Sequence, residues 1–209
     1  RSKGVGALNH LCRQPGLRRV LKASQIAERA AAVSAQDREP TQEFALFQMT
    51  LSCAAASLMT RFEKKHWATE REVLATASHL LRCCVRGEPF GGVTATLHSV
   101  LEALRLFSVS DANRQGLVEL GVLDGLAEVL GTWLEDPRKP LHPQLLGLER
   151  TLGLVVLLSS VRGCKRRLKE LEVAELLQGI VQSKPSNLSV TRSRRLLRDL
   201  GGAEHASES

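Results

Sequence analysis

Aromatic residues are scarce in this chain of 209 residues, where they make up 3% of the sequence and tyrosine is absent. Leucine, valine and alanine must therefore fill the core, and these side chains suit the packing of helix on helix better than a β-sandwich. The apolar content of 43% is that of a folded protein rather than a disordered one. No sustained alternation of apolar and polar residues flanked by hairpin turns is found, so the sequence does not predict β-strands.

Sequence signatures of catalysis are missing as well. The chain contains no GxSxG, no P-loop, no GxGxxG after a strand and no HExxH. Its six histidines are scattered, and His10 and Cys12 lie two residues apart, which on a helix turns them to different faces and makes a poor metal pair. We therefore predict a non-enzymatic protein with no catalytic residue, no cofactor and no metal.

Cysteines are few and form no CxxC pair; the five are Cys12, Cys53, Cys83, Cys84 and Cys164. Most stand at apolar positions of predicted helices, which indicates buried, reduced thiols rather than a disulfide framework. We therefore expect a cytoplasmic or nuclear location, or both. A redox-active pair of Cys83 and Cys84 is the alternative, but successive side chains on a helix point about 100° apart.

Long apolar runs are also lacking. Residues 44–60 carry no charge, yet they include Gln48, Thr50 and Ser52, and a membrane span needs about 20 mainly apolar residues. We interpret them as part of a buried helix from Glu43 to Phe62 and predict no membrane contact. The chain begins with Arg1 rather than Met, so we expect a fragment or a processed product.

The stretch from Val100 to Leu130 predicts three helices folded around two corners. Its first part has the i, i+1, i+4, i+7 spacing that places one apolar stripe on one face: Val100, Leu101, Leu104 and Phe107. Ser110 or Asp111 can cap a short second helix, and Gly121 can end it in the left-handed conformation. A third helix is then lined by Leu123, Leu126, Val129 and Leu130.

The chain also repeats itself. The segment from Ala7 aligns without a gap with the segment from Ala103, at an offset of 96, and the segment from Asn113 aligns with the segment from Cys164, at an offset of 51. A weaker copy lies between them and ends with a long helix from Val73. Three breaks containing Pro or Gly are predicted to separate the units: Asp37–Thr41, Arg86–Gly92 and Asp136–Pro143.

The order of short helix, glycine and long helix is carried by Asn113, Leu117, Gly121, Val122, Leu123, Leu126 and Leu130, with counterparts near Leu21 and Leu168. It resembles the armadillo (ARM/HEAT-like) helical repeat family. The resemblance implies an all-α fold, a right-handed α-solenoid of about three to four repeats. In that family the third helices line a concave groove that binds extended peptides or partner helices. We expect one domain over residues 1–202 and a disordered tail at 203–209.

The groove residues are predicted from the final helix of each unit. On the predicted helix Thr94–Val109, three polar residues share a face beside the leucine stripe, and arginines take polar positions on the next two such helices. Together they predict a mixed-charge, mainly basic ladder that binds a protein or peptide: His98, Glu102, Arg105, Arg150 and Arg195. The alternative is that these are ordinary surface residues.

Basic residues gather towards the two ends, with 13 basic and five acidic residues in 138–200. The patch comprises a run on a short helix and a stripe on the final helix, Asn187–Leu200: Lys165, Arg166, Arg167, Lys169, Arg192, Arg194 and Arg198. It predicts a solvated face or a surface for an acidic partner. Nucleic acid is the alternative, although no stacking aromatics lie nearby. A role as a subunit of a larger assembly also fits. The inward residues of that helix are predicted to be Leu188, Val190, Leu196, Leu197 and Leu200.

Overall fold

The structure is a computed structural model that describes residues 11, 14, 41–135 and 141–201. The regular secondary structure in these ranges is helical, apart from an isolated β-bridge between Phe90 and Val93. The prediction of an all-α fold is therefore confirmed. The helices are α4 (Gln42–Leu58), α5 (Arg61–His66), α6 (Arg71–Arg86), α7 (Leu97–Phe107), α8 (Asp111–Glu119), α9 (Val122–Glu135), α10 (Leu141–Leu158), α11 (Cys164–Glu170), α12 (Val173–Ser183) and α13 (Asn187–Asp199).

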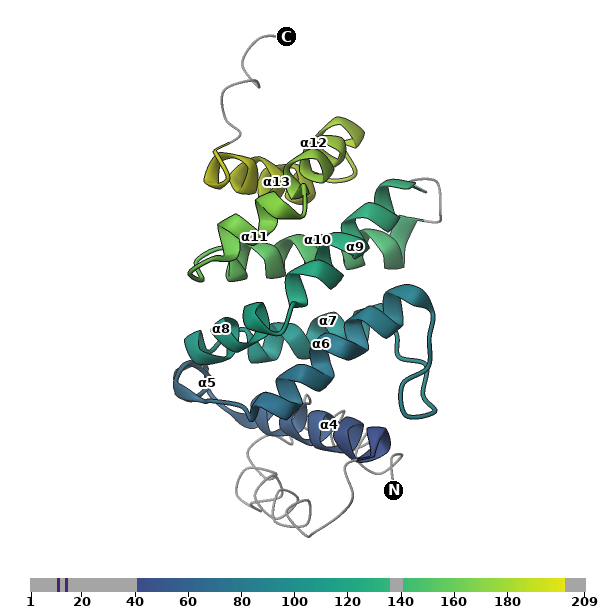
Figure 1. Cartoon of the computed structure of the whole chain (residues 1–209), viewed down its shortest axis with the longest axis vertical. Coiled ribbons are helices and arrows are strands. Elements are labelled where there is room, and N and C mark those ends of the chain that lie inside the picture. The colour runs from purple at the N-terminus through teal and green to yellow at the C-terminus, as the bar shows by residue number, and fades with distance from the viewer. Residues whose placement is uncertain (1–10, 12–13, 15–40, 136–140, 202–209) are drawn as a thin grey trace.

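The helices follow one another along the long axis of the molecule, with α4 at one end and α12 and α13 at the other (Figure 1). Two series of helices pack in sequence. In the first, α4 contacts α7, α7 contacts α10, and α10 contacts α13. In the second, α6 contacts α9, and α9 contacts α12. The short helices α5 and α8 contact each other, and α11 packs on α9 and α12.

The apolar stripe predicted for the first helix forms the middle of the core. Val100 is 1% exposed, and Leu101, Leu104 and Phe107 are fully buried. On α9, Leu123, Leu126 and Leu130 are likewise inaccessible to solvent. Leucines from α6, α10 and α12 belong to the same continuous cluster, so burial of aliphatic side chains between neighbouring helices drives the packing.

Local capping explains where the helices of this region begin and end. Thr96 caps α7 by accepting a hydrogen bond from the Ser99 N–H at 3.3 Å, so the helix is shorter than the predicted Thr94–Val109. Ser110 caps α8, as predicted, through the Asn113 N–H. Gly121 has φ +75° between α8 and α9, the left-handed conformation that the sequence predicts there.

Two predicted boundaries are wrong. The helix predicted over Glu43–Phe62 ends at Leu58, because Thr60 starts α5 with a capping box: Thr60 N–H donates to the Glu63 carboxylate at 2.6 Å, and Glu63 N–H donates to the Thr60 hydroxyl at 3.2 Å. The break predicted over Asp136–Pro143 extends too far, since α10 begins at Leu141. A proline as third helical residue is tolerated because the first N–H groups need no partner within the helix.

The helices that carry the predicted groove residues do not end their units. The helix from Val73, predicted to end its unit, is α6, and it packs on α9, the third helix of the Val100–Leu130 stretch, whereas α7 packs on α10, and each of these two begins the chain segment after a predicted break. The break at Arg86–Gly92 therefore precedes α7, and the break at Asp136–Pro143 precedes α10, so each lies before a helix of the first series. The N-terminal copy from Ala7, the break at 37–40 and the tail at 203–209 lie outside the described residues.

On α13 the predicted inward face is wrong in part. Leu196 and Leu200 are buried, and Val190 and Leu197 are half-buried, but Leu188 is 44% exposed. Ser189 and Ser193 occupy the buried face instead. Small side chains there let α13 lie close to α10 and α12, so the helix does not need a leucine in its first turns.

Glycines on α9 and α12 lie against leucine side chains of the preceding helix in the second series. A Cβ atom at Gly125 would lie 2.9 Å from Cδ2 of Leu81 on α6, and one at Gly179 would lie 3.2 Å from Cδ1 of Leu134 on α9. A methyl group at either position would force the facing leucine side chain to shift. Gly131, on the same helix as Gly125, faces open space.

Candidate interaction surfaces

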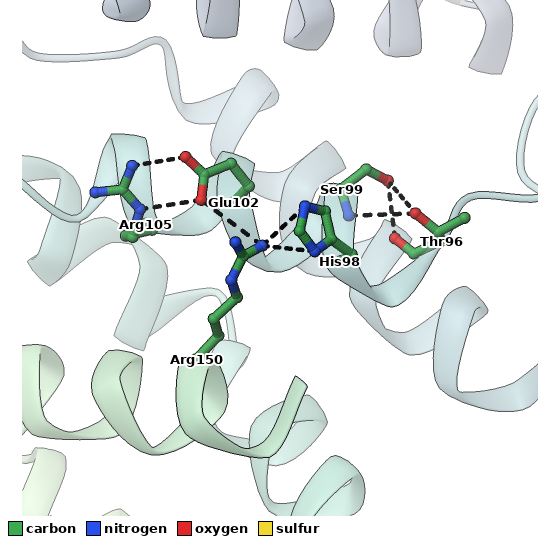
Figure 2. A network of polar contacts seen from close by, with 6 residues as sticks. All are labelled: Thr96, His98, Ser99, Glu102, Arg105 and Arg150. Atoms are coloured by element: carbon green, nitrogen blue, oxygen red, sulfur yellow. Dashed lines mark hydrogen bonds and ion pairs between the residues drawn. The ribbon is translucent and has the colours of Figure 1, made fainter. Parts of the chain in front are cut away.

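Four of the five predicted groove residues lie together where α7 packs on α10 (Figure 2). Arg105 donates two hydrogen bonds to Glu102, one turn earlier on α7, at 2.6 Å and 3.1 Å. Arg150 reaches across from α10, with Nη1 3.9 Å from the same carboxylate. The same Nη1 atom lies 2.8 Å and 3.0 Å from the two ring nitrogens of His98. We call these four residues the α7–α10 network.

Glu102 is the centre of the network. Its side chain is 16% exposed, and it faces two guanidinium groups, so part of the positive charge of each is matched. The hydrogen bond to Glu102 raises the pKa of Arg105, against an opposing effect of partial burial. The Arg105 side chain remains 52% exposed. The network therefore ties two helices together and presents one oriented guanidinium to solvent.

Arg195 stands apart from the other predicted groove residues. It is exposed on α13, and no hydrogen bond or ion pair joins it to the α7–α10 network within the described chain. The predicted ladder therefore has its contacts on two helices rather than three. Its mainly basic character is reduced, because Glu102 is shared by Arg105 and Arg150.

The basic run on α11 divides into paired and unpaired residues. Arg167 pairs with Asp124 on α9 and with Glu170, and Arg166 lies 3.5 Å from Glu170. The hydrogen bond to Asp124 is the main cause that raises the pKa of Arg167. Lys165 and Lys169 are exposed and form no ion pair with a described residue.

The basic stripe on α13 divides in the same way. Arg192 is half-buried and donates to the backbone carbonyl of Glu149 on α10, with its guanidinium lying over Gly153. Arg192 therefore holds α13 on α10. Arg194 and Arg198 point to solvent and have no ion pair within the described part of the chain.

A shallow hollow of about 480 Å³ lies between α11 and the end of α13. It is lined by Lys165, Arg166, Lys169, Asp199, Leu200 and Gly201. The sequence predicted the three cations but not the residues of α13 that complete the hollow. Gly201, with φ +83°, ends α13 here, and its position after the last leucine is the signal that marks where the helix stops beside α11.

No disulfide joins the described cysteines, of which Cys53, Cys83 and Cys164 are buried and Cys84 is half-buried. Burial raises the pKa of Cys164 to about 11. Burial, and to a lesser extent its neighbour Cys83, raises the pKa of Cys84, which donates to the Ala95 carbonyl. These environments suppress thiolate formation and are unlike those of reactive cysteines. Cys12 lies outside the described residues.

Two further kinds of site are absent from the described ranges. No group of three or more His, Cys, Asp or Glu side chains there is arranged to hold a metal ion. Among the helices described, none has the length and apolar character that crossing a membrane requires. Comparison of the chain with protein-family models, with curated proteins and with solved structures gives no match in any of the three.

Proposed function

We propose that the chain is an armadillo-like, right-handed α-solenoid of three to four repeats that binds a protein partner and catalyses no reaction. The observation that carries the proposal is the serial packing of α4, α7, α10 and α13, accompanied by that of α6, α9 and α12. Helices that pack in series bury their apolar faces against the units before and after them. Such an array leaves an extended lateral surface for a partner.

The proposed binding surface is centred on the α7–α10 network. It lies on the first series, whose helices begin the predicted units, rather than on the third helices that line the groove in the armadillo family. His98 is exposed and Arg105 is half-exposed, while Glu102 and Arg150 beneath them are mostly covered. The bidentate contact with Glu102 fixes the Arg105 guanidinium before a partner arrives, so less side-chain entropy is lost on binding. A peptide or helix with carboxylate or carbonyl oxygens fits this surface.

Nucleic-acid binding through the basic ends is the alternative. It receives less support because residues 141–209 contain no Phe, Trp or Tyr on which bases can stack. The reduced thiols fit a location in the cytoplasm, the nucleus or both, and the extended surface fits a subunit of a larger assembly. No grouping of candidate catalytic residues in the sequence supports an enzymatic role.

Affinity purification of the chain from a cell lysate, followed by mass spectrometry, tests the proposal. The informative variant is His98→Ala with Arg105→Ala, which removes the two solvent-facing members of the α7–α10 network. The matched control is Arg61→Ala with His66→Ala, the same two residue types at exposed positions on the short helix α5. We expect the first variant to lose proteins that the control retains, with both keeping the helical circular dichroism of the parent. Identical sets of captured proteins would remove the support for this surface.

A further inference from the structure

The hollow between α11 and α13 carries an excess of uncompensated positive charge. Lys165 and Lys169 lie one turn apart on α11, and both line the hollow without an ion pair to a described residue. Arg166, whose side chain is 86% exposed, lines it too and lies 3.5 Å from Glu170. Arg71, by contrast, is an exposed cation that is matched by a carboxylate, in its ion pair with Glu119.

The positive surface continues from the hollow onto α13. Asp199 lines the hollow, and Arg195 precedes it by four residues, so the two share one face of the helix. Arg198 is exposed in the last turn, beside the residues that line the hollow. We call Lys165, Arg166, Lys169, Arg195 and Arg198 the α11–α13 basic surface. It gathers cations from two helices that lie at the same end of the molecule (Figure 1).

We propose that the α11–α13 basic surface binds an acidic segment of a partner protein, with carboxylates of the segment over Lys165 and Lys169. The two lysines are flexible point charges, which accept carboxylates in many orientations. Because the hollow is shallow and open, it suits an extended segment lying across the surface rather than an enclosed small molecule.

Two features favour a protein segment over nucleic acid. First, no aromatic residue is present in 141–209 to stack a base. Second, Asp199 lines the hollow itself, and Glu170 lies beside it in contact with Arg166. The regular phosphates of a nucleic acid would meet these carboxylates, whereas a peptide can place a hydroxyl or amide opposite Asp199 and its acidic residues opposite the lysines. This surface is separate from the α7–α10 network and does not depend on the function proposed above.

Fluorescence anisotropy with a labelled peptide of ten glutamates tests the inference, using the full chain at about 0.15 M salt. A single-stranded DNA of ten nucleotides serves as the second ligand. The test variant is Lys165→Glu with Lys169→Glu. The matched control is Lys65→Glu with Lys184→Glu, which makes the same change of charge at exposed positions on α5 and after α12. Circular dichroism establishes that both variants are folded.

We expect the peptide to bind the parent chain, the control to keep that affinity within about threefold, and the test variant to weaken it at least tenfold, since like charges then face each other. The DNA should bind more weakly than the peptide. Equal losses in the two variants would mean that net charge alone attracts the peptide, which overturns the inference. So would absence of peptide binding, or tighter binding of DNA that is lost in the test variant.

Discussion

Asn113 and Thr69, which lie 44 residues apart, exchange two hydrogen bonds. Thr69 N–H donates to the Asn113 side-chain carbonyl at 2.8 Å, and the Asn113 amide donates to the Thr69 hydroxyl at 3.0 Å. The same amide nitrogen donates to the Phe107 carbonyl at 3.2 Å. Asn113 therefore joins the end of α7, the start of α8 and the segment before α6. Such a side chain fixes how one group of helices sits on the next.

Replacing Asn113 should destabilise the fold. In Asn113→Ala the Thr69 N–H loses its acceptor and the Phe107 carbonyl keeps only the Ser110 N–H, at a site where Asn113 is 1% exposed. We therefore expect a loss of about 2–3 kcal/mol in the free energy of unfolding. Urea denaturation measures it. The control, Asn187→Ala, changes an exposed asparagine and should cost less than about 0.5 kcal/mol. Equal effects would show that Asn113 does not join these segments.

The α7–α10 network predicts a defined role for Glu102. In Glu102→Gln the carboxylate that faces Arg105 and Arg150 becomes neutral, so the two guanidinium groups lose their shared anion. We expect a loss of stability of about 1–2 kcal/mol, because the site is partly buried. Glu88→Gln, at an exposed loop position, is the control. Equal unfolding midpoints for the variant and the parent chain would mean that the network does not hold α7 on α10.

Two glycines on α9 should respond in opposite ways to the same substitution. Gly125→Ala gains helix propensity but places a methyl group 2.9 Å from a carbon of Leu81, whose side chain is fully buried. We expect a net loss of about 1–2 kcal/mol, since overpacking outweighs the gain. Gly131→Ala meets nothing within 4 Å and should stabilise by about 0.5–1 kcal/mol. Thermal unfolding of the two variants decides the matter, and stabilisation by both would contradict the close packing of α6 on α9.

Thiol chemistry should depend steeply on pH at Cys164. With a pKa of about 11, roughly one thiol in a thousand is ionised at pH 8, and the fraction rises tenfold for each unit of pH. Alkylation by iodoacetamide at pH 8, read by mass spectrometry of peptides, should therefore leave Cys164 unmodified in the folded chain and modify it fully in urea. Rapid modification of the native protein would show that this thiol is not buried in the folded chain.

The fold could be predicted from the sequence where the spacing of apolar residues and the capping residues indicate the same helix. Leu101, Leu104 and Phe107 have the spacing of one helix face and are fully buried, and Ser110 and Gly121 mark the corners on either side of α8. The prediction fails where polar residues occupy the buried face of a helix. Ser189 and Ser193 replace Leu188 on the inner side of α13, because helices that approach closely need small side chains rather than apolar ones.

The candidate sites were predicted in part, for a physical reason. Helical spacing places His98, Glu102 and Arg105 on one face of α7, and that much is visible in a sequence. Contacts between helices are not, so Arg167 and Arg192 seemed equivalent to their neighbours, although Arg167 pairs with Asp124 and Arg192 binds the Glu149 carbonyl. The contribution of Asp199 to the hollow was missed for the same reason.

The serial arrangement of helices is the claim on which both proposed surfaces depend, and a distance between its two ends tests it most directly. Spin labels carried by non-natural amino acids at positions 43 on α4 and 191 on α13, both exposed, can be measured by double electron–electron resonance. Packed helices lie about 8–10 Å apart, so the three steps from α4 through α7 and α10 to α13 predict a separation of about 25 Å or more. A single distribution centred below about 15 Å, the spacing of helices in a closed bundle, would contradict the serial arrangement.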